Sequence, residues 1–371
     1  MTAHILCVAG TRPEVIKMAP VILALQQMRW ANVRMLATAQ HREMLDDTLA
    51  QFGIVPDIDL DIMRNDQPLA ALTARLITGI DDVLVSERPD IVLAQGDTTT
   101  VFAAALACFY RRIPFGHVEA GLRTGDFANP FPEEMNRSFV ARLAALHFPP
   151  TASARANLLR EGVADTAIHV TGNTVIDAVR WMAEQNPVHG LPVGEGCKVI
   201  LLTCHRRENF GAPLDQILAA VKRLAGLYPQ VLIAYPVHPN PNVSGPVRRA
   251  LSGMANVLLI EPLGYDQLVA LMKACHFVMT DSGGLQEEAP ALGKPVLVLR
   301  EETERPEAVA AGTAVLVGHD EEFIVREACR LLDDEAHYLK MARAISPYGD
   351  GHAGERIAAV LGTWLGNRKE S

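Results

Sequence analysis

Residues 277–290, FVMTDSGGLQEEAP, are the stretch that decides the fold class of this chain. The first three residues are apolar and predict a short buried strand, and Gly283 and Gly284 remove side chains where the backbone turns into the next helix. The N-terminus of such a helix offers unpaired backbone N–H groups to an anion, to which Ser282 can add a hydroxyl. The two glutamates that follow would repel a bare phosphate but suit the hydroxyls of a ribose. The stretch is therefore typical of an α/β fold and favours a nucleotide ligand, with plain turn chemistry as the alternative.

Short apolar runs with helical patterns between them recur along the rest of the chain. Near-continuous apolar strands that alternate with amphipathic helices are typical of parallel sheets covered on both faces. The series pauses at residues 187–196, which are rich in proline and glycine and which we expect to be a linker or domain edge. Because 371 residues exceed what one hydrophobic core usually serves, we predict two doubly wound α/β domains with a ligand cleft between them, at the carboxyl ends of the strands. The apolar runs are HILCVAG, VRMLATA, DIVLAQG, FGHVEAG, VILLTCH, QVLIAYPVH, NVLLIEPL, FVMTDSG and PVLVLRE.

The composition argues against several classes of function. The formal net charge is −9 and aromatic residues make up 5% of the chain, which disfavours nucleic-acid binding. The histidines lack HxxxH or HxH spacing and no GxGxxG follows the first strand, so we expect neither a metal nor a redox cofactor. The six cysteines are far apart in the sequence and are expected to be reduced. Because the chain starts without a basic, cleavable leader and no apolar run approaches about 20 residues, we expect a cytoplasmic protein that does not enter the membrane.

Polar residues gather where the expected strands end. A strand-to-helix turn needs only one capping side chain, so charged and hydroxyl residues after six strands are hard to explain as solvation alone. We therefore expect these turns to build a ligand site. They are residues 10–14, 96–100, 119–123, 205–209, 238–240 and 281–284.

Five polar side chains are candidates for chemistry, and four of them also have a structural interpretation. Arg12 can start a helix beside a proline or clamp a diphosphate. Asp97 can cap a helix or act as a catalytic carboxylate, whereas Glu119 has no helix to cap. Glu133 can enrich the first turn of a helix, and His205 can be a satisfied histidine at a strand end. Two arginines follow His205 and would lower its pKa, which favours a neutral base or an anion contact.

Long motifs follow one another over nearly the whole chain: GTRPEVIKMAPV, QGDTTT, GHVEAGLRTGD with PFPEEMNR, TGNTVIDAV, HRRENFG, YPVHPNPNV, TDSGGLQEEAPALGKPVLV and TERPEAVAAGT. Together they resemble the non-hydrolysing UDP-N-acetylglucosamine 2-epimerases. The resemblance implies two Rossmann-like domains of the glycosyltransferase B type, a homodimer, no cofactor and a role in polysaccharide biosynthesis. It implies an N-terminal domain of residues 1–173 plus 356–371, to which the last helix returns, and a UDP-binding domain of residues 174–355.

The resemblance also implies a reaction, the interconversion of UDP-N-acetylglucosamine and UDP-N-acetylmannosamine. UDP leaves C1 as the C2 proton is removed, a glycal is held beside UDP, and UDP adds back after protonation from the other face. Such chemistry needs carboxylates near C2 and cations around the leaving diphosphate. By resemblance, the acid–base residues are Asp97, Glu119, Glu133 and His205. The assignment of a carboxylate to each face stays open.

The same resemblance implies a set of contacts to the nucleotide sugar. An arginine, a histidine and the serine–glycine turn match the positions that bind the diphosphate, and a glutamate matches the ribose contact. From the sequence alone, Arg305 has an ion pair as its alternative role. The implied substrate-binding residues are Arg12, Lys17, His205, Ser282, Gly283, Gly284, Glu288 and Arg305.

The chain departs from the family pattern at a few positions. Several members bind a second UDP-N-acetylglucosamine as an activator through glutamines and an arginine. Gln40 matches that pattern, but Glu43 and Asp66 stand where Gln and Arg are expected, so we do not expect this activation. Cys204 stands before His205 where a smaller residue is expected.

Four other functions compete with this interpretation. A hydrolysing epimerase has a start that resembles GTRADYG, which Pro13, Glu14 and Lys17 contradict. An epimerase for UDP-2,3-diacetamido sugars has a GARPQ-like start, which Thr11 and Glu14 disfavour. A nucleotide-sugar sensor could lack the carboxylates that this chain keeps, and a glycosyltransferase would need an acceptor site that no motif marks.

Overall fold

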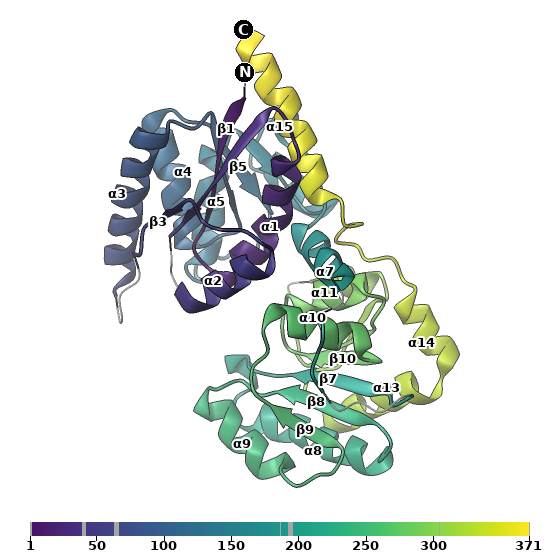
Figure 1. The fold of residues 1–371 in the computed structure, drawn as a ribbon. Helices are drawn as coiled ribbons and strands as arrows, with labels where there is room; N and C mark the ends of the chain where they lie inside the picture. The colour runs from purple at the N-terminus through teal and green to yellow at the C-terminus, as the bar shows by residue number, and fades with distance from the viewer. Residues whose placement is uncertain are drawn as a thin grey trace. The chain divides into compact units, whose positions relative to one another are not determined.

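The computed structural model describes residues 2–38, 42–62, 67–185, 187–191, 196–303 and 305–370, and only the backbone of residues 42–44, 369 and 370. The chain divides into two compact units, unit 1 with Met1–Ala178 and Tyr348–Ser371, and unit 2 with Val179–Pro347. Each unit contains one six-stranded sheet whose strands all run parallel (Figure 1). In both sheets the first strand is central and the order reverses beside it, as in Rossmann folds. The predicted fold class, two Rossmann-like domains of the glycosyltransferase B type, is confirmed.

The sheet of unit 1 has the order β3-β2-β1-β4-β5-β6. Its strands are β1 (Ala3–Ala9), β2 (Ala31–Ala37), β3 (Ile58–Asp59), β4 (Ile91–Gln95), β5 (Phe115–Val118) and β6 (Leu146–Phe148). Its helices are α1 (Arg12–Gln26), α2 (Arg42–Gln51), α3 (Leu69–Glu87), α4 (Thr99–Arg111), α5 (Glu133–Leu143), α6 (Ala152–Arg160), the 3-10 turn η1 (Asp165–Ala167), the first part of α7 (Thr174–Glu184) and α15 (Ala353–Glu370).

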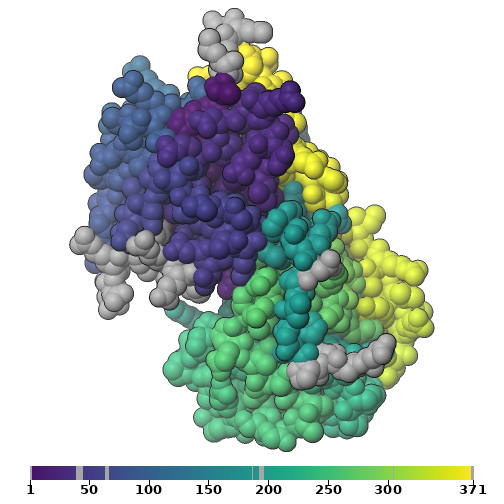
Figure 2. Space-filling view, viewed as in Figure 1, coloured from purple at the N-terminus to yellow at the C-terminus, as the bar shows by residue number. Residues whose placement is uncertain are grey.

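Helices α3, α4 and α5 cover one face of this sheet, and α1 and α15 pack together on the other side (Figure 1). α1 begins where the sequence requires it, because Thr11 and Glu14 form a capping box around Pro13. α15 approaches α1 so closely that a Cβ at Gly354 would lie 2.7 Å from the carbonyl oxygen of Pro20. Figure 2 shows the last segment, in yellow, against the surface of unit 1. The expected return of the final helix to the first unit is therefore observed.

The sheet of unit 2 has the order β12-β11-β10-β7-β8-β9. Its strands are β7 (Val199–Thr203), β8 (Leu232–Pro236), β9 (Val257–Ile260), β10 (Phe277–Thr280), β11 (Val296–Val298) and β12 (Ala314–Leu316). Its helices are the rest of α7, η2 (Arg207–Asn209), α8 (Ala212–Leu227), α9 (Pro241–Leu251), α10 (Tyr265–Ala274), α11 (Leu285–Ala291), α12 (Pro306–Ala310), α13 (Glu321–Asp333) and α14 (Glu335–Ala342).

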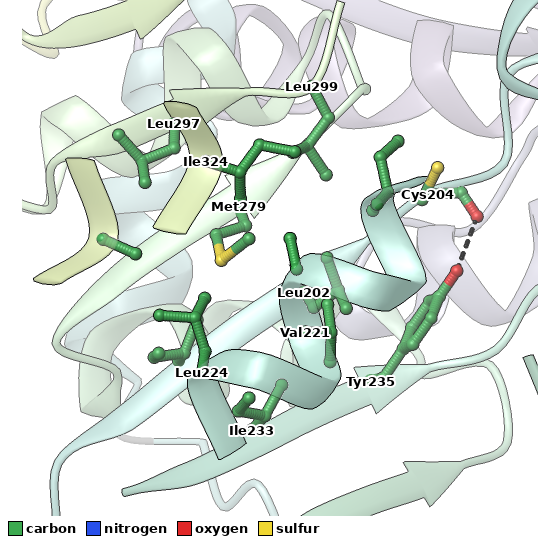
Figure 3. Close-up of a cluster of buried hydrophobic side chains, with 14 of the residues drawn as sticks. Leu202, Cys204, Val221, Leu224, Ile233, Tyr235, Met279, Leu297, Leu299 and Ile324 are labelled. Carbon is green, nitrogen blue, oxygen red and sulfur yellow. Dashed lines mark hydrogen bonds between the residues drawn. The ribbon is translucent and has the colours of Figure 1, made fainter. Parts of the chain in front are cut away.

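The core of unit 2 lies between its sheet and the helices α8, α9 and α13. Figure 3 shows part of it, with Leu202, Ile233 and Met279 from the strands facing Val221 and Leu224 from α8. These strands are apolar on both faces because helices cover both sides of a parallel sheet. Residues 277–290 form β10, a turn and the start of α11, as predicted.

The chain crosses between the units inside α7 and just before Tyr348. The family resemblance implies crossings at 173/174 and 355/356 instead. The intervening residues cluster with unit 1 because Asn173 N donates to Tyr348 O at 2.7 Å and Gly354 N donates to Asp177 Oδ1 at 2.8 Å. Of the stretch 187–196, expected to be a linker or domain edge, residues 187–191 and 196 are described and belong to unit 2. Over the parts of the chain that are described, no helix combines the length and apolarity that crossing a bilayer requires.

Candidate active site

In unit 1, Glu119 is the centre of a buried hydrogen-bond network at the carboxyl end of β5. Its backbone has a left-handed φ of 59°, which is uncommon for a residue with a side chain and is frequent at functional sites. Lys17 Nζ on α1 lies 2.8 Å from Oε1 and 2.7 Å from Oε2. Asn173 Nδ2 donates to Oε1 at 3.1 Å, and Gln95 Nε2 at the end of β4 donates to Oε2. The network therefore fixes both oxygens of Glu119 and places the predicted residues Lys17 and Glu119 in one ion pair.

Asp97 follows Gly96 in the turn after β4, and Gly96 has a left-handed φ of 89°. The sequence left open whether Asp97 caps a helix, and the structure decides against it, because Thr98 is the N-cap of α4. Two residues of α5 hold Asp97 instead. Asn136 Nδ2 donates to its backbone oxygen at 2.8 Å, and Arg137 Nε lies 3.4 Å from Oδ2.

The carboxyl group of Asp97 has a perturbed proton affinity. Burial raises its pKa, the Arg137 guanidinium opposes this, and the negative charge of Glu119 raises the pKa further. The charge of Glu133 acts in the same direction, so the other two predicted carboxylates both lie within electrostatic reach of Asp97. A raised pKa brings a carboxyl group closer to the pH at which a general acid or base works best.

Glu133 and Glu134 are neighbours in sequence but have different environments at the start of α5. Glu134 is buried, accepts the backbone N–H groups of Thr124 and Gly125 at 3.0–3.1 Å, and lies 3.1 Å from Arg137 Nε. Glu133 is the first residue of the helix and is partly exposed. The predicted choice of Glu133 is therefore compatible with contact to a ligand, whereas Glu134 holds the loop before the helix.

Glu14 is a site residue that the sequence marks only as part of the family's characteristic start. It is buried, and its Oε2 accepts the N–H groups of Gly10 at 2.8 Å and Thr11 at 2.7 Å. Its Oε1 accepts from the hydroxyl of Thr98 beside Asp97, and burial raises its pKa. Glu14 thus ties the turn after β1 to the turn after β4. The T-x-x-E capping-box spacing could have identified its structural part.

Arg12, the predicted diphosphate clamp, is the first residue of α1 and is partly exposed. It makes no ion pair or hydrogen bond within the described portion of the chain, so its guanidinium is available to a ligand. The positions that match the activator site of some family members are not fully described by the structure. Gln40 and Asp66 lie outside the described residues, and only the backbone of Glu43 is described.

In unit 2, His205 follows β7 and lies at the surface of the sheet's carboxyl end, with 37% of its side chain exposed. Burial lowers its pKa, the carboxylate of Asp281 opposes this, and His238 and Arg206 lower it further. The expected influence of the following arginines is therefore present for Arg206, but burial has the larger effect. The ring stacks on that of His238, with centroids 5.5 Å apart.

Ser282, Gly283 and Gly284 form the turn between β10 and α11. A Cβ at Gly283 would come within 3.5 Å of the Arg206 guanidinium, and one at Gly284 within 3.6 Å of the Glu288 carboxylate. These are ordinary contact distances, and neither glycine has a positive φ, so neither is required by backbone strain. The turn places a hydroxyl, a guanidinium and the first N–H groups of a helix together.

The two acids of α11 are both buried and have different partners. Glu288 Oε1 accepts from the Tyr265 hydroxyl at 3.0 Å. Glu287 pairs with Arg305, so the ion pair that the sequence left as an alternative for Arg305 is observed. The predicted ribose contact, Glu288, is thus the acid of α11 that pairs with a hydroxyl group, whereas Glu287 pairs with a cation. In the described parts of the chain no three His, Cys, Asp or Glu side chains form a metal-type cluster, and all six cysteines are free.

Comparison with known proteins finds a matching family model and three similar proteins. A family model described as UDP-N-acetylglucosamine 2-epimerase matches residues 23–362. The UDP-N-acetylglucosamine 2-epimerase of Escherichia coli K12 is 51% identical over 367 residues, which covers 96% of this chain and 98% of that protein. The crystal structure of the UDP-GlcNAc 2-epimerase of Neisseria meningitidis bound to UDP-GlcNAc has a TM-score of 0.89 and 47% identity, covering 97% of this chain and 100% of that one. The Staphylococcus aureus protein MnaA, solved with UDP, has a TM-score of 0.86 and 44% identity, with coverage of 98% and 97%.

Proposed function

The chain belongs to the UDP-N-acetylglucosamine 2-epimerase family, and on that premise we propose that it reversibly epimerises UDP-N-acetylglucosamine at C2 to UDP-N-acetylmannosamine. We propose further that the reaction proceeds by elimination and re-addition of UDP through a glycal. The observation that carries the proposal is that two further carboxylates, Glu119 and Glu133, lie within electrostatic reach of the buried Asp97.

The elimination removes the C2 proton to a carboxylate while the C2–H electrons form the C1–C2 double bond. The C1–O bond breaks as this double bond forms, and its electron pair leaves with the diphosphate of UDP. Re-addition reverses these steps after a proton reaches the opposite face of C2. The enzyme therefore needs two groups that exchange protons with C2 and cations that stabilise the released diphosphate.

The contacts of the carboxylates favour Asp97 and Glu133 for the proton transfers. Both oxygens of Glu119 are already engaged by Lys17 and by side-chain amides, which suits a fixed negative charge better than a mobile base. Asp97 is held through one oxygen and its backbone, and its raised pKa suits a group that must accept and return a proton. Glu133 is partly exposed at a helix start.

On the nucleotide side, we propose that Arg12, His205 and the Ser282-Gly283-Gly284 turn bind the diphosphate. A guanidinium, an imidazole and helix N–H groups are donors of the kind that bind phosphate oxygens. Glu288 is proposed to accept from the ribose hydroxyls. Arg305 is proposed to act in the site from its ion pair with Glu287. The homodimer and the cytoplasmic location remain predictions.

The test is proton NMR of the purified protein with UDP-N-acetylglucosamine in D2O. We expect UDP-N-acetylmannosamine with deuterium at C2 and no free sugar. Free N-acetylmannosamine with stoichiometric UDP would instead establish hydrolysis, and bound but unchanged substrate would establish a sensor or a different sugar specificity.

Single variants of the carboxylates sharpen this test. D97N and E133Q should each lower turnover by about 10²-fold or more, which is the usual contribution of a positioned acid or base. D81N is the matched control, because Asp81 forms a partly exposed ion pair with Arg111 away from these turns and should leave turnover unchanged.

A further inference from the structure

Asp281 is a buried carboxylate that the proposed mechanism does not use. It directly follows β10, and none of its surface is exposed. Its Oδ2 accepts from the backbone N–H groups of His205 and Arg206, both at 2.8 Å, and from Asn209 Nδ2 at 3.0 Å. These three bonds hold the loop that follows β7 against the end of β10.

The second oxygen of Asp281 is different. Oδ1 is buried and has no hydrogen-bond partner among the described residues, and it lies 3.4 Å from Nδ1 of His205. A buried polar atom without a partner is costly, and such atoms in native proteins call for an explanation. Holding the loop does not provide one, because the side-chain oxygen of an asparagine could accept the same backbone N–H groups. The negative charge and the free oxygen point to the imidazole.

We propose that Asp281 is a positioning residue for His205, and that its Oδ1 accepts the Nδ1–H of the ring while Nε2–H is donated to the diphosphate of the nucleotide. This inference rests on the proposed function, because it needs a diphosphate as the second acceptor. Both ring nitrogens are donors only in the imidazolium, so the arrangement stabilises the protonated ring when negative charge collects on departing UDP. A small rotation of His205 closes the 3.4 Å separation.

The other charged groups around the ring do not replace Asp281. His238 stacks on His205 and its Nδ1 accepts the N–H of Asn240 at 3.1 Å. Both His238 and the Arg206 guanidinium lower the pKa of His205, and Asp281 is the carboxylate that raises it. Without a ligand, burial outweighs this and the pKa of His205 is below its usual range.

The groups that face Asp281 from the other side are neutral. Burial, with the charge of Asp281, raises the pKa of the Cys204 thiol well above its usual range, and burial does the same for the Tyr235 hydroxyl. Figure 3 shows that this hydroxyl is already used, because it donates to the backbone oxygen of Cys204 at 3.0 Å. The imidazole of His205 is therefore the titratable group whose charged form Asp281 stabilises.

The test is the variant D281N in the full-length chain, which removes the charge and keeps an acceptor for the loop. We expect the pKa of His205, followed by NMR with H205N as the assignment control, to fall in D281N both with and without UDP. We expect kcat to fall about 10²-fold with KM changed less than about threefold, because an amide facing Nδ1 favours the wrong tautomer. Because the protonated ring is the active form, the alkaline limb of the kcat profile should move to lower pH.

N209A is the control for a purely structural role. It removes another bond of the same loop but keeps the carboxylate, so it should lower the stability of unit 2 and leave the pKa of His205 unchanged. If D281N does not fold, the ¹⁵N shifts of His205 in the wild-type complex with UDP still decide the question. A protonated Nδ1 is expected, and an unprotonated Nδ1 overturns the inference.

The outcomes separate this inference from the proposed function. If the wild-type protein epimerises UDP-N-acetylglucosamine while D281N keeps the wild-type pKa of His205 and its kcat, the role of Asp281 is refuted and the epimerase stands. If the wild-type protein does not act on UDP-N-acetylglucosamine, the proposed function fails, and the role of Asp281 towards a diphosphate fails with it.

Discussion

Lowering the pH from about 8 to about 5 should destabilise unit 1 through two buried histidines. His117 on β5 and His147 on β6 are register partners in the sheet, with 0% and 1% of their surfaces exposed. Burial lowers the pKa of His117 to about 3 and that of His147 to about 4. Both rings are therefore neutral at physiological pH, and His117 Nε2 donates to Gly96 O at 2.7 Å.

The size of the effect follows from the pKa values. An unfolded chain binds protons on histidine below about pH 6.5, whereas these two folded histidines stay neutral until about pH 3 and about pH 4. The unfolded state binds more protons in this window, so the free energy of unfolding falls as the pH falls. At about pH 5 each histidine should have lowered the free energy of unfolding of unit 1 by about 2 kcal/mol, and the pair by about 4 kcal/mol.

The assay is urea unfolding at the two pH values for the wild type, H117Q, H147Q and the double variant. Glutamine does not titrate, and at position 117 it can still donate a hydrogen bond. Trp181 belongs to unit 2 and the other two tryptophans to unit 1, so a W181F background makes fluorescence report on unit 1. H352Q is the control, because His352 is a largely exposed histidine of the same unit.

Between the two pH values, H117Q and H147Q should each lose about 2 kcal/mol less free energy of unfolding than the wild type, and the double variant about 4 kcal/mol less. H352Q should lose as much as the wild type. Asp97 and Glu14 also titrate with shifted pKa values, but they are the same in all variants and cancel in the comparison. If H117Q and H147Q keep the full acid sensitivity of the wild type, neutral burial of these rings is not its cause.

Two further predictions concern the packing around the candidate site. K17M should destabilise unit 1 by roughly 3 kcal/mol, because it leaves the buried Glu119 carboxylate without its cation. In urea unfolding, the double variant K17M/E119Q should lose less free energy of unfolding than the two single variants added together. Simple additivity would contradict the ion pair. G121A should lower the melting temperature far more than G162A. Both glycines have a left-handed φ, in which an alanine costs about 1–2 kcal/mol, but of the two only Gly121 has an atom close to an added Cβ, the carbonyl oxygen of Ala154. Equal losses would mean that backbone strain alone matters.

The fold could be predicted from the sequence because its determinants are local. Each apolar run is long enough for one buried strand, and each helix start carries its own signal, such as the capping box of Thr11 and Glu14. Parallel strands all end at the same edge, so polar residues after successive strands had to meet there. The strand ends account in this way for Asp97 and Glu119, and the family resemblance adds Glu133 to the predicted site.

The partners of those residues could not be predicted in the same way. Lys17 and Glu119 are 102 positions apart, and His205 and Asp281 are 76 apart, so no local pattern records that they touch. Nothing in the local sequence distinguishes Glu133 from Glu134 either, although one is partly exposed and the other buried.

The sequence by itself thus determined the strand–turn–helix units, the edge of each sheet where chemistry collects, and the family. Only the tertiary structure decided the protonation and orientation of the groups there. Burial and nearby charges set the pKa values of Asp97 and His205, and both depend on which distant residues surround them. The physical reason is that strand and helix formation depend on neighbours along the chain, whereas desolvation and charge depend on neighbours in space.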